Sequence, residues 1–189
     1  MKIISIDSKN AITQARDILA AGGVIVYPTD TIYGFGVDAK NEKAIHRLNS
    51  AKDRKGAISV MAPNKLTALS WANISDKDVK QMESKLGGYT TIIYPVKNGI
   101  VSTSILGKNN TLGVRIPDHK FCNTLSALFT NPITTTSVNK HGSIPLNNPE
   151  LIMNEFGHEI DLLIDQGNLE GNQRSVMFKL DHSDLIQIR

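Results

Sequence analysis

The feature that decides the fold is a short apolar strand that leads into a polar loop, Val24-Ile25-Val26-Tyr27-Pro28-Thr29-Asp30-Thr31-Ile32-Tyr33-Gly34-Phe35-Gly36. The apolar run at 24–27 is typical of a strand buried on both faces. The loop after it carries small hydroxyls, an aromatic ring and two glycines. Loops at strand ends are where α/β sheets place ligands, because backbone N–H groups and hydroxyls lie there on a rigid support. The stretch therefore favours an α/β fold with a ligand site near 28–36, although an ordinary turn would show the same residues.

Strand-like and helix-like patterns alternate on both sides of this stretch. Before it, residues 2–6 indicate a strand, and residues 11–19 indicate a helix that Asp7 or Ser8 caps and Gly22-Gly23 ends. Further strands are predicted at 58–62, 90–94, 111–116, 133–137, 162–165, 176–180 and 185–188, and further helices after the caps Asn41, Ser75 and Asn148 and at 121–128. We therefore expect an α/β (α+β) protein with a twisted, mostly open mixed sheet flanked by helices.

The composition fits one folded domain over residues 1–189. Hydrophobic residues make up 40% of the chain and charged residues 21%, which excludes a disordered, collagen-like or coiled-coil protein. No segment approaches the roughly 18 apolar residues of a membrane span, and the lone Cys122 agrees with a reducing compartment, so we expect no membrane contact and a cytoplasmic location. The net charge of +3 suits an anionic ligand but is too small to require a nucleic-acid partner.

Several common binding and catalytic motifs do not fit the sequence. Gly34-x-Gly36-x-x-Ala39 matches a relaxed dinucleotide fingerprint, but six residues separate the strand from the first glycine. The sequence contains no P-loop and no Gly-x-Ser-x-Gly nucleophile motif. Its five histidines lack the spacing of metal ligands. We therefore expect neither covalent catalysis nor a metal site built by the protein.

A basic pair, Lys52 and Arg54, follows the helix that is predicted to end near Ala51. In an extended chain the two side chains project to one side and offer a point charge and a planar fork to phosphate oxygens. The same charges would also compensate the dipole at the end of a helix. The local pattern is compatible with both roles.

Alternation along residues 111–116 divides a second candidate strand into two faces. Its leucine, valine and isoleucine face the core, whereas Thr111, Gly113 and Arg115 share the opposite face. The bare glycine leaves room for a ligand between a hydroxyl and a guanidinium. An edge strand that faces water would show the same pattern.

A third candidate strand, residues 133–137, carries four consecutive hydroxyl residues and continues into Val138-Asn139. Ser137 and Asn139 share a parity, so both side chains can bond one ligand. The structural alternative is that threonine simply favours strands and asparagine favours turns.

Taken in order, these segments resemble the YrdC/TsaC family of threonylcarbamoyl-AMP synthases, from about residue 11 to residue 189. The family motifs Pro-Thr-Glu/Asp-Thr-x-Tyr-Gly-x-Gly, Lys-x-Arg, Val-x-Val-Arg, Thr-Ser-x-Asn and Ser-Thr-Val are similar to 28–36, 52–54, 112–115, 136–139 and 175–177. Each motif alone is weak, but five in the right order are specific. The resemblance implies a YrdC-like fold with a concave, positively charged cavity.

The resemblance also implies a reaction. The family's enzymes are nucleotidyltransferases that join ATP, L-threonine and bicarbonate into threonylcarbamoyl-AMP and release pyrophosphate. ATP is then a substrate, with Mg²⁺ held mainly by its phosphates. The product would pass to a downstream tRNA threonylcarbamoyl transferase complex that modifies the adenosine next to the anticodon.

Residue by residue, the resemblance divides the expected site into two sides. Lys52 and Arg54 would be the catalytic cations. The ATP side would consist of Lys52, Arg54, Thr111, Asn139, Asn147 and Arg189. The threonine side would consist of Thr31, Tyr33, Arg115, Ser137 and Ser175, with Arg115 pairing with the carboxylate and Tyr33 shaping the pocket.

Two other functions are compatible with the residues. One is a YrdC-like module that binds RNA or a nucleotide without synthesis, with weak RNA binding at most, since aromatic residues are only 5% of the chain. The other is a related carbamoyl-adenylate transfer domain that uses another acceptor. The sequence departs from the family pattern in the short stretch Lys55-Gly56-Ala57 and in Ser175-Val176, and we expect the short form without a further C-terminal domain.

Overall fold

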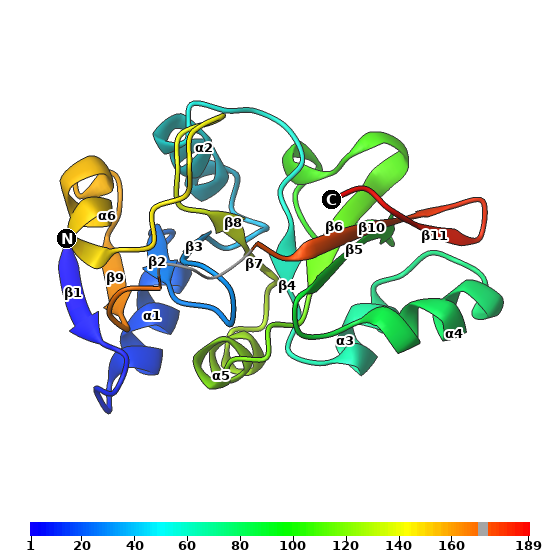
Figure 1. Ribbon diagram of the computed structural model, residues 1–189, viewed down its shortest axis with the longest axis horizontal. Helices are drawn as coiled ribbons and strands as arrows, with labels where there is room; N and C mark the ends of the chain where they lie inside the picture. The colour runs from blue at the N-terminus through cyan, green and yellow to red at the C-terminus, as the bar shows by residue number, and fades with distance from the viewer. Residues whose placement is uncertain (170–173) are drawn as a thin grey trace.

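The computed structural model of the protein describes residues 1–169 and 174–189, and its strands form two neighbouring sheets (Figure 1). Sheet A consists, in spatial order, of β1 (Lys2–Ser5), β9 (Leu162–Asp165), β2 (Ile25–Tyr27), β3 (Gly34–Gly36) and β8 (Thr136–Ser137). Sheet B consists of β11 (Asp184–Gln187), β10 (Val176–Asp181), β5 (Thr90–Pro95), β6 (Thr111–Arg115), β4 (Val60–Met61) and β7 (Ile133–Thr134). Both sheets combine parallel and antiparallel pairs. The predicted mixed α/β architecture is confirmed, but the strands form two sheets where the sequence suggested one.

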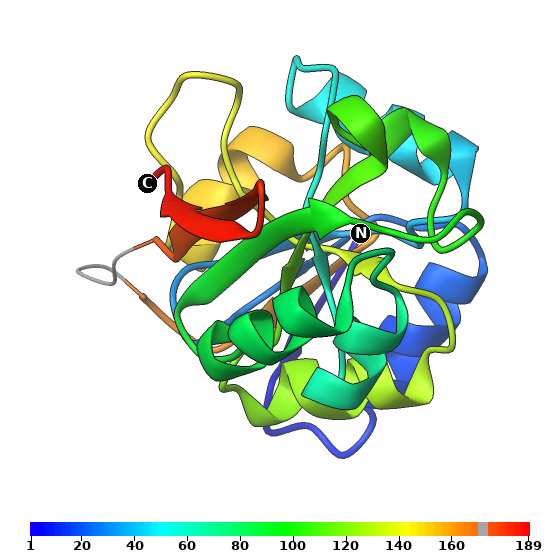
Figure 2. The ribbon, with the colours of Figure 1, turned by 90° about the vertical axis from the view of Figure 1, so that its right-hand side faces the viewer.

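Helices cover the outer faces of both sheets. They are α1 (Ala11–Ala20), α2 (Glu42–Ala51), α3 (Lys65–Ser70), α4 (Asp76–Lys85), α5 (Lys120–Leu128) and α6 (Pro149–Phe156), with short 3₁₀ turns η1 (Thr103–Ile105) and η2 (Lys108–Asn110). Figure 2 shows sheet B facing the viewer, with α3 and α4 packed along it. No helix among the described residues is long and apolar enough to cross a membrane.

Side-chain caps set the starts of three helices as predicted. Asn41 accepts a hydrogen bond from the backbone of Ala44, and Ser75 and Asn148 cap α4 and α6 in the same way. The predicted cap of α1 at Asp7 or Ser8 is wrong. That helix begins at Ala11 after Asn10, whose side chain makes no capping bond, because the Ser8 hydroxyl donates to it instead.

The strand that opens the deciding stretch is buried on both faces. Ile25 and Tyr27 pack in a cluster with residues of α1 and α5, whereas Val24 and Val26 pack in a larger cluster with apolar residues of both sheets. A strand so enclosed is held by close packing on both faces. The loop after it therefore starts from a rigid point.

Two departures from the predicted elements create the seam between the sheets. The loop at 28–36 contains a short strand, β3, which pairs with β2 and β8. The predicted strand at 133–137 breaks at Thr135, whose backbone N–H donates to the Ser59 carbonyl at 2.7 Å. The chain thus passes from sheet B at β7 to sheet A at β8, and it carries its run of hydroxyls into the seam.

The two glycines of β3 differ in how closely their surroundings pack. A Cβ at Gly36 would lie 2.7 Å from Tyr27 Cε1 and 3.2 Å from Ile133 Cγ2, whereas a Cβ at Gly34 would meet nothing closer than 3.6 Å. We expect Gly36→Ala to lower the free energy of unfolding by about 1–3 kcal/mol because it overpacks the core. Gly34→Ala is the control and should change the free energy of unfolding much less than Gly36→Ala does. Equal losses in denaturant titrations of the two variants would contradict this packing.

Candidate functional site

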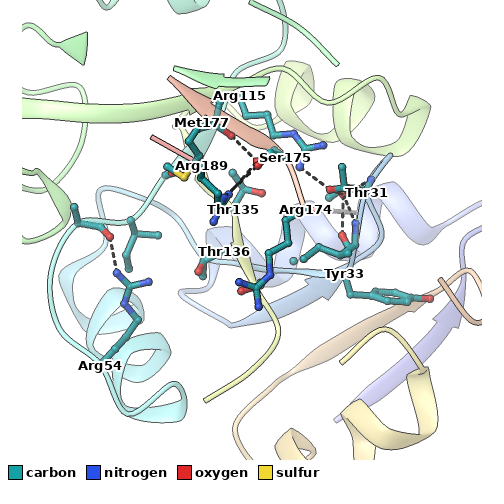
Figure 3. Close-up of a pocket in the computed structure, with 18 residues that line it drawn as sticks. Thr31, Tyr33, Arg54, Arg115, Thr135, Thr136, Arg174, Ser175, Met177 and Arg189 are labelled. Atoms are coloured by element: carbon teal, nitrogen blue, oxygen red, sulfur yellow. Dashed lines mark hydrogen bonds between the residues drawn. The ribbon is translucent and has the colours of Figure 1, made fainter. Parts of the chain in front are cut away.

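A cavity of about 260 Å³ lies at the seam between the two sheets. Its lining comes from the loop between β2 and β3, from residues 54–59, from Thr91 and Arg115 in sheet B, from residues 135–137, and from residues 174–177 with Arg189. Figure 3 shows these side chains converging from segments that are far apart in the sequence. The two β-sheets therefore meet at one hollow, which residues of both sheets line.

Arginine supplies the charge of this cavity. Among the described residues, four arginines line it and no acidic side chain does: Arg54, Arg115, Arg174 and Arg189. Burial lowers the pKa of Arg54, and burial followed by the nearby Arg174 and Arg115 lowers the pKa of Arg189. Both pKa shifts indicate that the positive charges of these guanidinium groups are not fully balanced by nearby negative charges. Such a cavity attracts anions, and polyanions above all.

Among the described residues, only Arg115 of the four has a carboxylate partner. Its Nη2 atom lies 2.6 Å from Asp30 Oδ1, and each of the two side chains is only 6% exposed. Arg115 Nη1 also donates to the Thr31 hydroxyl at 2.8 Å, and Nε donates to the Gly88 carbonyl at 3.3 Å. Since a guanidinium has five N–H donors, two remain for a ligand. Arg115 is therefore held in one orientation and still able to bind.

The loop between β2 and β3 is tied together by hydroxyls. The Thr29 hydroxyl donates to the Ile32 carbonyl at 2.8 Å and accepts from the Thr31 backbone at 3.0 Å. The Thr29 and Thr31 hydroxyls lie 2.9 Å apart. Because the Thr29 proton is used on a carbonyl, Thr31 donates within this pair and accepts from Arg115. The loop thus holds Thr31 and Arg115 against each other.

Arg189 and Ser175 form the opposite wall. Arg189 donates from Nε to the Ser175 carbonyl at 3.2 Å and from Nη2 to its hydroxyl at 3.3 Å. The same hydroxyl lies 2.9 Å from that of Thr91 in β5. A cation and two hydroxyls are therefore held together where β5 and β10 run side by side.

Tyr33 belongs to the cavity lining, and its hydroxyl is held by two backbone groups. That hydroxyl donates to the Gly167 carbonyl at 2.8 Å and accepts from the Gln166 backbone at 2.9 Å. Burial raises the pKa of Tyr33 to about 12. The group is neutral at physiological pH, and its two hydrogen bonds tie the loop to the residues after β9.

The five residues expected on the threonine side all line this one cavity. Of those expected on the ATP side, Arg54 and Arg189 line it, whereas Lys52, Thr111, Asn139 and Asn147 are not among its lining residues. Thr111 lines an adjoining hollow of about 610 Å³, which shares Ala57, Ile58, Ser59 and Met177 with the cavity. The Asn147 side chain accepts from the Tyr33 backbone at 3.2 Å.

Lys52 lies behind the cavity wall. It is 2% exposed, and its ammonium donates to the carbonyls of Ser137 and Asn139. The expectation that Lys52 and Arg54 project to one side of an extended chain is wrong. Lys52 has helical backbone angles and Asp53 has a φ of +49°, so the chain turns between the two cations.

Sequence reasoning missed three parts of the site. No motif singles out Arg174 in the sequence. It lies at the cavity because the chain leads from there into β10. Asp30 belongs to the loop motif, but the sequence does not reveal that it pairs with Arg115. Thr135 and Thr136 fit a strand equally well, and only the break at Thr135 turns them toward the cavity. The hydroxyl run at 134–137 is the signal for them, but only Ser137 of this run was expected at the site.

The lining does not suit a metal ion held by the protein. No group of three His, Cys, Asp or Glu side chains that could hold one exists among residues 1–169 and 174–189. The charged side chains that face the cavity are arginines, which repel cations. Mg²⁺ does not fit here as a resident ion, so phosphate oxygens of a ligand would have to hold it.

Known proteins resemble this chain over nearly all its length. The Sua5/YciO/YrdC family model, which is described as "Telomere recombination", matches residues 17–189. The chain is 30% identical over 178 residues to the threonylcarbamoyl-AMP synthase of Photobacterium profundum, an alignment that covers 92% of this chain and 95% of that protein.

Solved structures share the fold. The P. abyssi Sua5 structure complexed with L-threonine superposes with a TM-score of 0.89 at 23% identity, over all of this chain and 57% of that one. E. coli YciO superposes with a TM-score of 0.86 at 24% identity, over 99% of this chain and 92% of that one. This chain thus spans little more than half the length of Sua5 and nearly the full length of YciO.

Removing Asp30 tests the ion pair that fixes Arg115. We expect Asp30→Ala to lower the free energy of unfolding by about 3–5 kcal/mol, because it leaves a buried guanidinium unpaired. Asp7→Ala, at an exposed position, is the control and should have little effect. A loss near zero for Asp30→Ala in chemical denaturation would contradict the role of this pair.

The buried Lys52 predicts a pH dependence of stability. Burial, with smaller contributions from Arg54 and Arg174, lowers the pKa of Lys52 to about 7 from its ordinary 10.5. Between these values the unfolded chain binds a proton that the folded chain does not, so stability rises with pH. Relative to Lys52→Met, the wild-type unfolding free energy should rise by up to about 1.4 kcal/mol per pH unit between about pH 7 and about pH 9. Parallel pH profiles of the two proteins would show that Lys52 does not titrate there.

Proposed function

Because the chain belongs to the Sua5/YciO/YrdC family, we propose that it is a threonylcarbamoyl-AMP synthase. The enzyme would consume ATP, L-threonine and bicarbonate and release threonylcarbamoyl-AMP and pyrophosphate. The observation that carries this proposal is the cavity of four arginines and clustered hydroxyls, without an acidic lining residue among those described. The similarity to the Photobacterium profundum synthase, over 92% of this chain, supports it.

The charge of the cavity suits two anions of different size. Arg54, Arg174 and Arg189 have no carboxylate partner among the described ion pairs, so together they suit a triphosphate. Arg115 is neutralised by Asp30 but keeps two N–H donors, which suits a single carboxylate. We assign the phosphates to the first group and the threonine carboxylate to Arg115.

The chemistry needs positioning more than protein nucleophiles. Bicarbonate would give CO₂ and hydroxide, and the threonine nitrogen would attack the carbon of CO₂. The proton that the nitrogen loses would combine with the hydroxide as water, which leaves a carbamate. One carbamate oxygen would then attack the α-phosphorus of ATP as the bond from that phosphorus to the β-phosphate oxygen breaks. Pyrophosphate carries away the electron pair of that bond. Arginines stabilise the charge that spreads over the phosphate oxygens.

The neighbouring hollow would take the nucleoside. It shares residues 57–59 with the cavity and includes Thr111, so a bound nucleotide would extend along these residues from one to the other. Lys52, Asn139 and Asn147 would then act through the wall behind the substrates. Mg²⁺ would enter with the phosphates.

The product is expected to supply tRNA modification in the cytoplasm, through a separate transferase that uses the threonylcarbamoyl group on the adenosine beside the anticodon. The P. abyssi relative, seen with L-threonine, agrees with threonine as the amino acid. Weak RNA binding near the arginines would be compatible with this role. The two alternative functions, a binding module and a transferase for another acceptor, predict different products in the same assay.

The test is to incubate the protein with ATP, ¹⁴C-bicarbonate and one amino acid at a time. We expect pyrophosphate and a labelled adenylate with threonine only. A labelled adenylate with another acceptor would identify a related transferase. Retention of ATP or RNA without turnover would leave a binding module.

Arg54→Ala tests the assignment of the phosphates. We expect at least a hundredfold loss of kcat/KM for ATP, because about 3 kcal/mol of charge stabilisation in the transition state is lost, with little change in threonine affinity. Lys43→Ala removes an exposed cation from α2 and serves as the control. Unchanged turnover in Arg54→Ala would contradict this assignment and favour the alternative that Arg54 only compensates the dipole at the end of α2.

A further inference from the structure

A second hollow lies at the carboxyl ends of two parallel strands, β1 and β9, which run side by side (Figure 1). This β1–β9 hollow has a volume of about 870 Å³, and its lining includes Ser5, Asp165 and the start of α5. The described linings of this hollow and of the arginine-lined cavity have no residue in common. The carboxyl ends of parallel strands are where α/β sheets place ligands. The hollow is therefore a separate candidate site.

The β1–β9 hollow has charges of both signs in its lining. Asp7 and Asp165 contribute two carboxylates, and Lys120 contributes an ammonium. None of the three forms an ion pair with any part of the chain that the structure describes. Opposite charges that face one hollow without pairing suit a ligand that carries both an ammonium and a carboxylate.

His119 adds a buried hydrogen-bond acceptor to the same lining. Its Nε2 atom lies 2.8 Å from Gln166 Oε1. Because a carbonyl oxygen only accepts, Nε2 carries a proton, and in a neutral ring Nδ1 is then an acceptor. Nδ1 is buried and has no hydrogen-bond partner within residues 1–169 and 174–189. Since a buried acceptor without a donor is costly, the ammonium of a ligand would be favoured here.

The β1–β9 hollow also has apolar side chains. They are Ile6 after β1, Ile12 from α1 and Phe121 from α5. Ligand sites typically combine such an apolar surface with a few polar groups that fix the orientation of the ligand. An α-amino acid with an apolar side chain matches this combination, because it has an ammonium, a carboxylate and an apolar body.

A first set of hydrogen bonds joins this hollow to the loop between β2 and β3, which lines the cavity. The Tyr33 hydroxyl donates to the Gly167 carbonyl at 2.8 Å and accepts from the Gln166 backbone at 2.9 Å. Tyr33 belongs to the lining of the cavity, whereas Gln166 and Gly167 belong to that of the hollow. One phenol therefore connects the two sites.

A second connection runs through the residue before His119. The Asp118 backbone N–H donates to Asp30 Oδ2 at 3.0 Å, and the other carboxylate oxygen of Asp30 pairs with Arg115. The bond between His119 and Gln166 joins this connection to the first one. A ligand that holds His119 in place thus acts on both connections to the cavity.

We propose that the β1–β9 hollow is an effector site for an α-amino acid with an apolar side chain, coupled to the cavity through the loop between β2 and β3. The ammonium of the effector lies between Asp165 and His119, and its carboxylate faces Lys120. The bound effector stabilises the bond between His119 and Gln166 and with it the loop, so the cavity binds its own amino acid more tightly. The coupling rests on the proposed function, since it takes threonine as that amino acid, whereas the site itself does not.

Calorimetry with three related probes tests the charges of the site. The probes are L-phenylalanine, L-phenylalaninamide, which lacks the carboxylate, and 3-phenylpropionate, which lacks the ammonium. Asp165→Asn keeps the acceptor for the Gly167 backbone and should weaken L-phenylalanine and its amide about tenfold, the contribution of one charge-assisted hydrogen bond. Lys120→Met should weaken L-phenylalanine and 3-phenylpropionate to the same extent. Each variant should leave the third probe within about twofold. Glu155→Gln and Lys43→Met, at exposed positions, are the charge-matched controls.

L-leucine and glycine test the apolar part of the site. L-leucine should bind, and glycine should bind at least about tenfold more weakly, because it leaves the apolar side chains uncovered. No binding of either L-phenylalanine or L-leucine up to about 10 mM would overturn the proposal, and so would binding that neither Asp165→Asn nor Lys120→Met weakens. Equal affinities for glycine and L-leucine would overturn the class of ligand.

Threonine kinetics at saturating L-phenylalanine test the coupling. KM for threonine should fall about fivefold, and Tyr33→Phe, which keeps the ring but removes the connecting hydroxyl, should reduce this effect to less than about twofold. An unchanged or raised KM in the wild-type protein would overturn the coupling. A protein that forms no adenylate would refute the synthase alone, because the calorimetric response of L-phenylalanine to Asp165→Asn and Lys120→Met would still report on the site.

Discussion

The buried ion pair between Asp30 and Arg115 is the interaction on which the site depends. Asp30 belongs to the loop after β2 in sheet A, and Arg115 ends β6 in sheet B. Burying two charges is costly unless hydrogen bonds satisfy them. Here the Thr31 hydroxyl, the Gly88 carbonyl and the Asp118 backbone complete the set. The pair therefore fixes the two sheets at one separation, and the cavity lies beside it.

The pair also divides the charge of the cavity. Neutralising Arg115 leaves a directed pair of N–H donors without a large net charge, whereas Arg54, Arg174 and Arg189 contribute charge that no carboxylate among the described residues offsets. In the proposed synthase, these two regions would distinguish an amino acid from a polyanion by charge density. Both regions lie within one cavity of about 260 Å³, so the proposed function would place the two substrates next to each other.

The sequence correctly predicted those features that depend on interactions between residues close together in the chain. The caps at Asn41, Ser75 and Asn148 and the buried strand at 24–27 follow from hydrogen bonding and periodicity within a few residues, and the structure has them. The five threonine-side residues were expected from the order of the family motifs, and they line one cavity. Their roles remain proposals.

Tertiary contacts decided the rest. The break at Thr135 depends on a bond to Ser59, about 76 residues away in the chain, and no pattern within 133–137 encodes it. The sequence predicted that Lys52 binds phosphate, because the residues around a lysine do not reveal whether its side chain is exposed or buried. Only the carbonyls of Ser137 and Asn139, supplied by another element, turn its ammonium inward.

The most direct measurement is a crystal structure of the protein with threonine and a non-hydrolysable ATP analogue. We expect the triphosphate among Arg54, Arg174 and Arg189, the threonine carboxylate on Arg115, and Lys52 still bonded to the carbonyls of Ser137 and Asn139. A triphosphate bound outside the seam between the sheets, for example in the hollow beside His119 and Lys120, would contradict the assignment of the site.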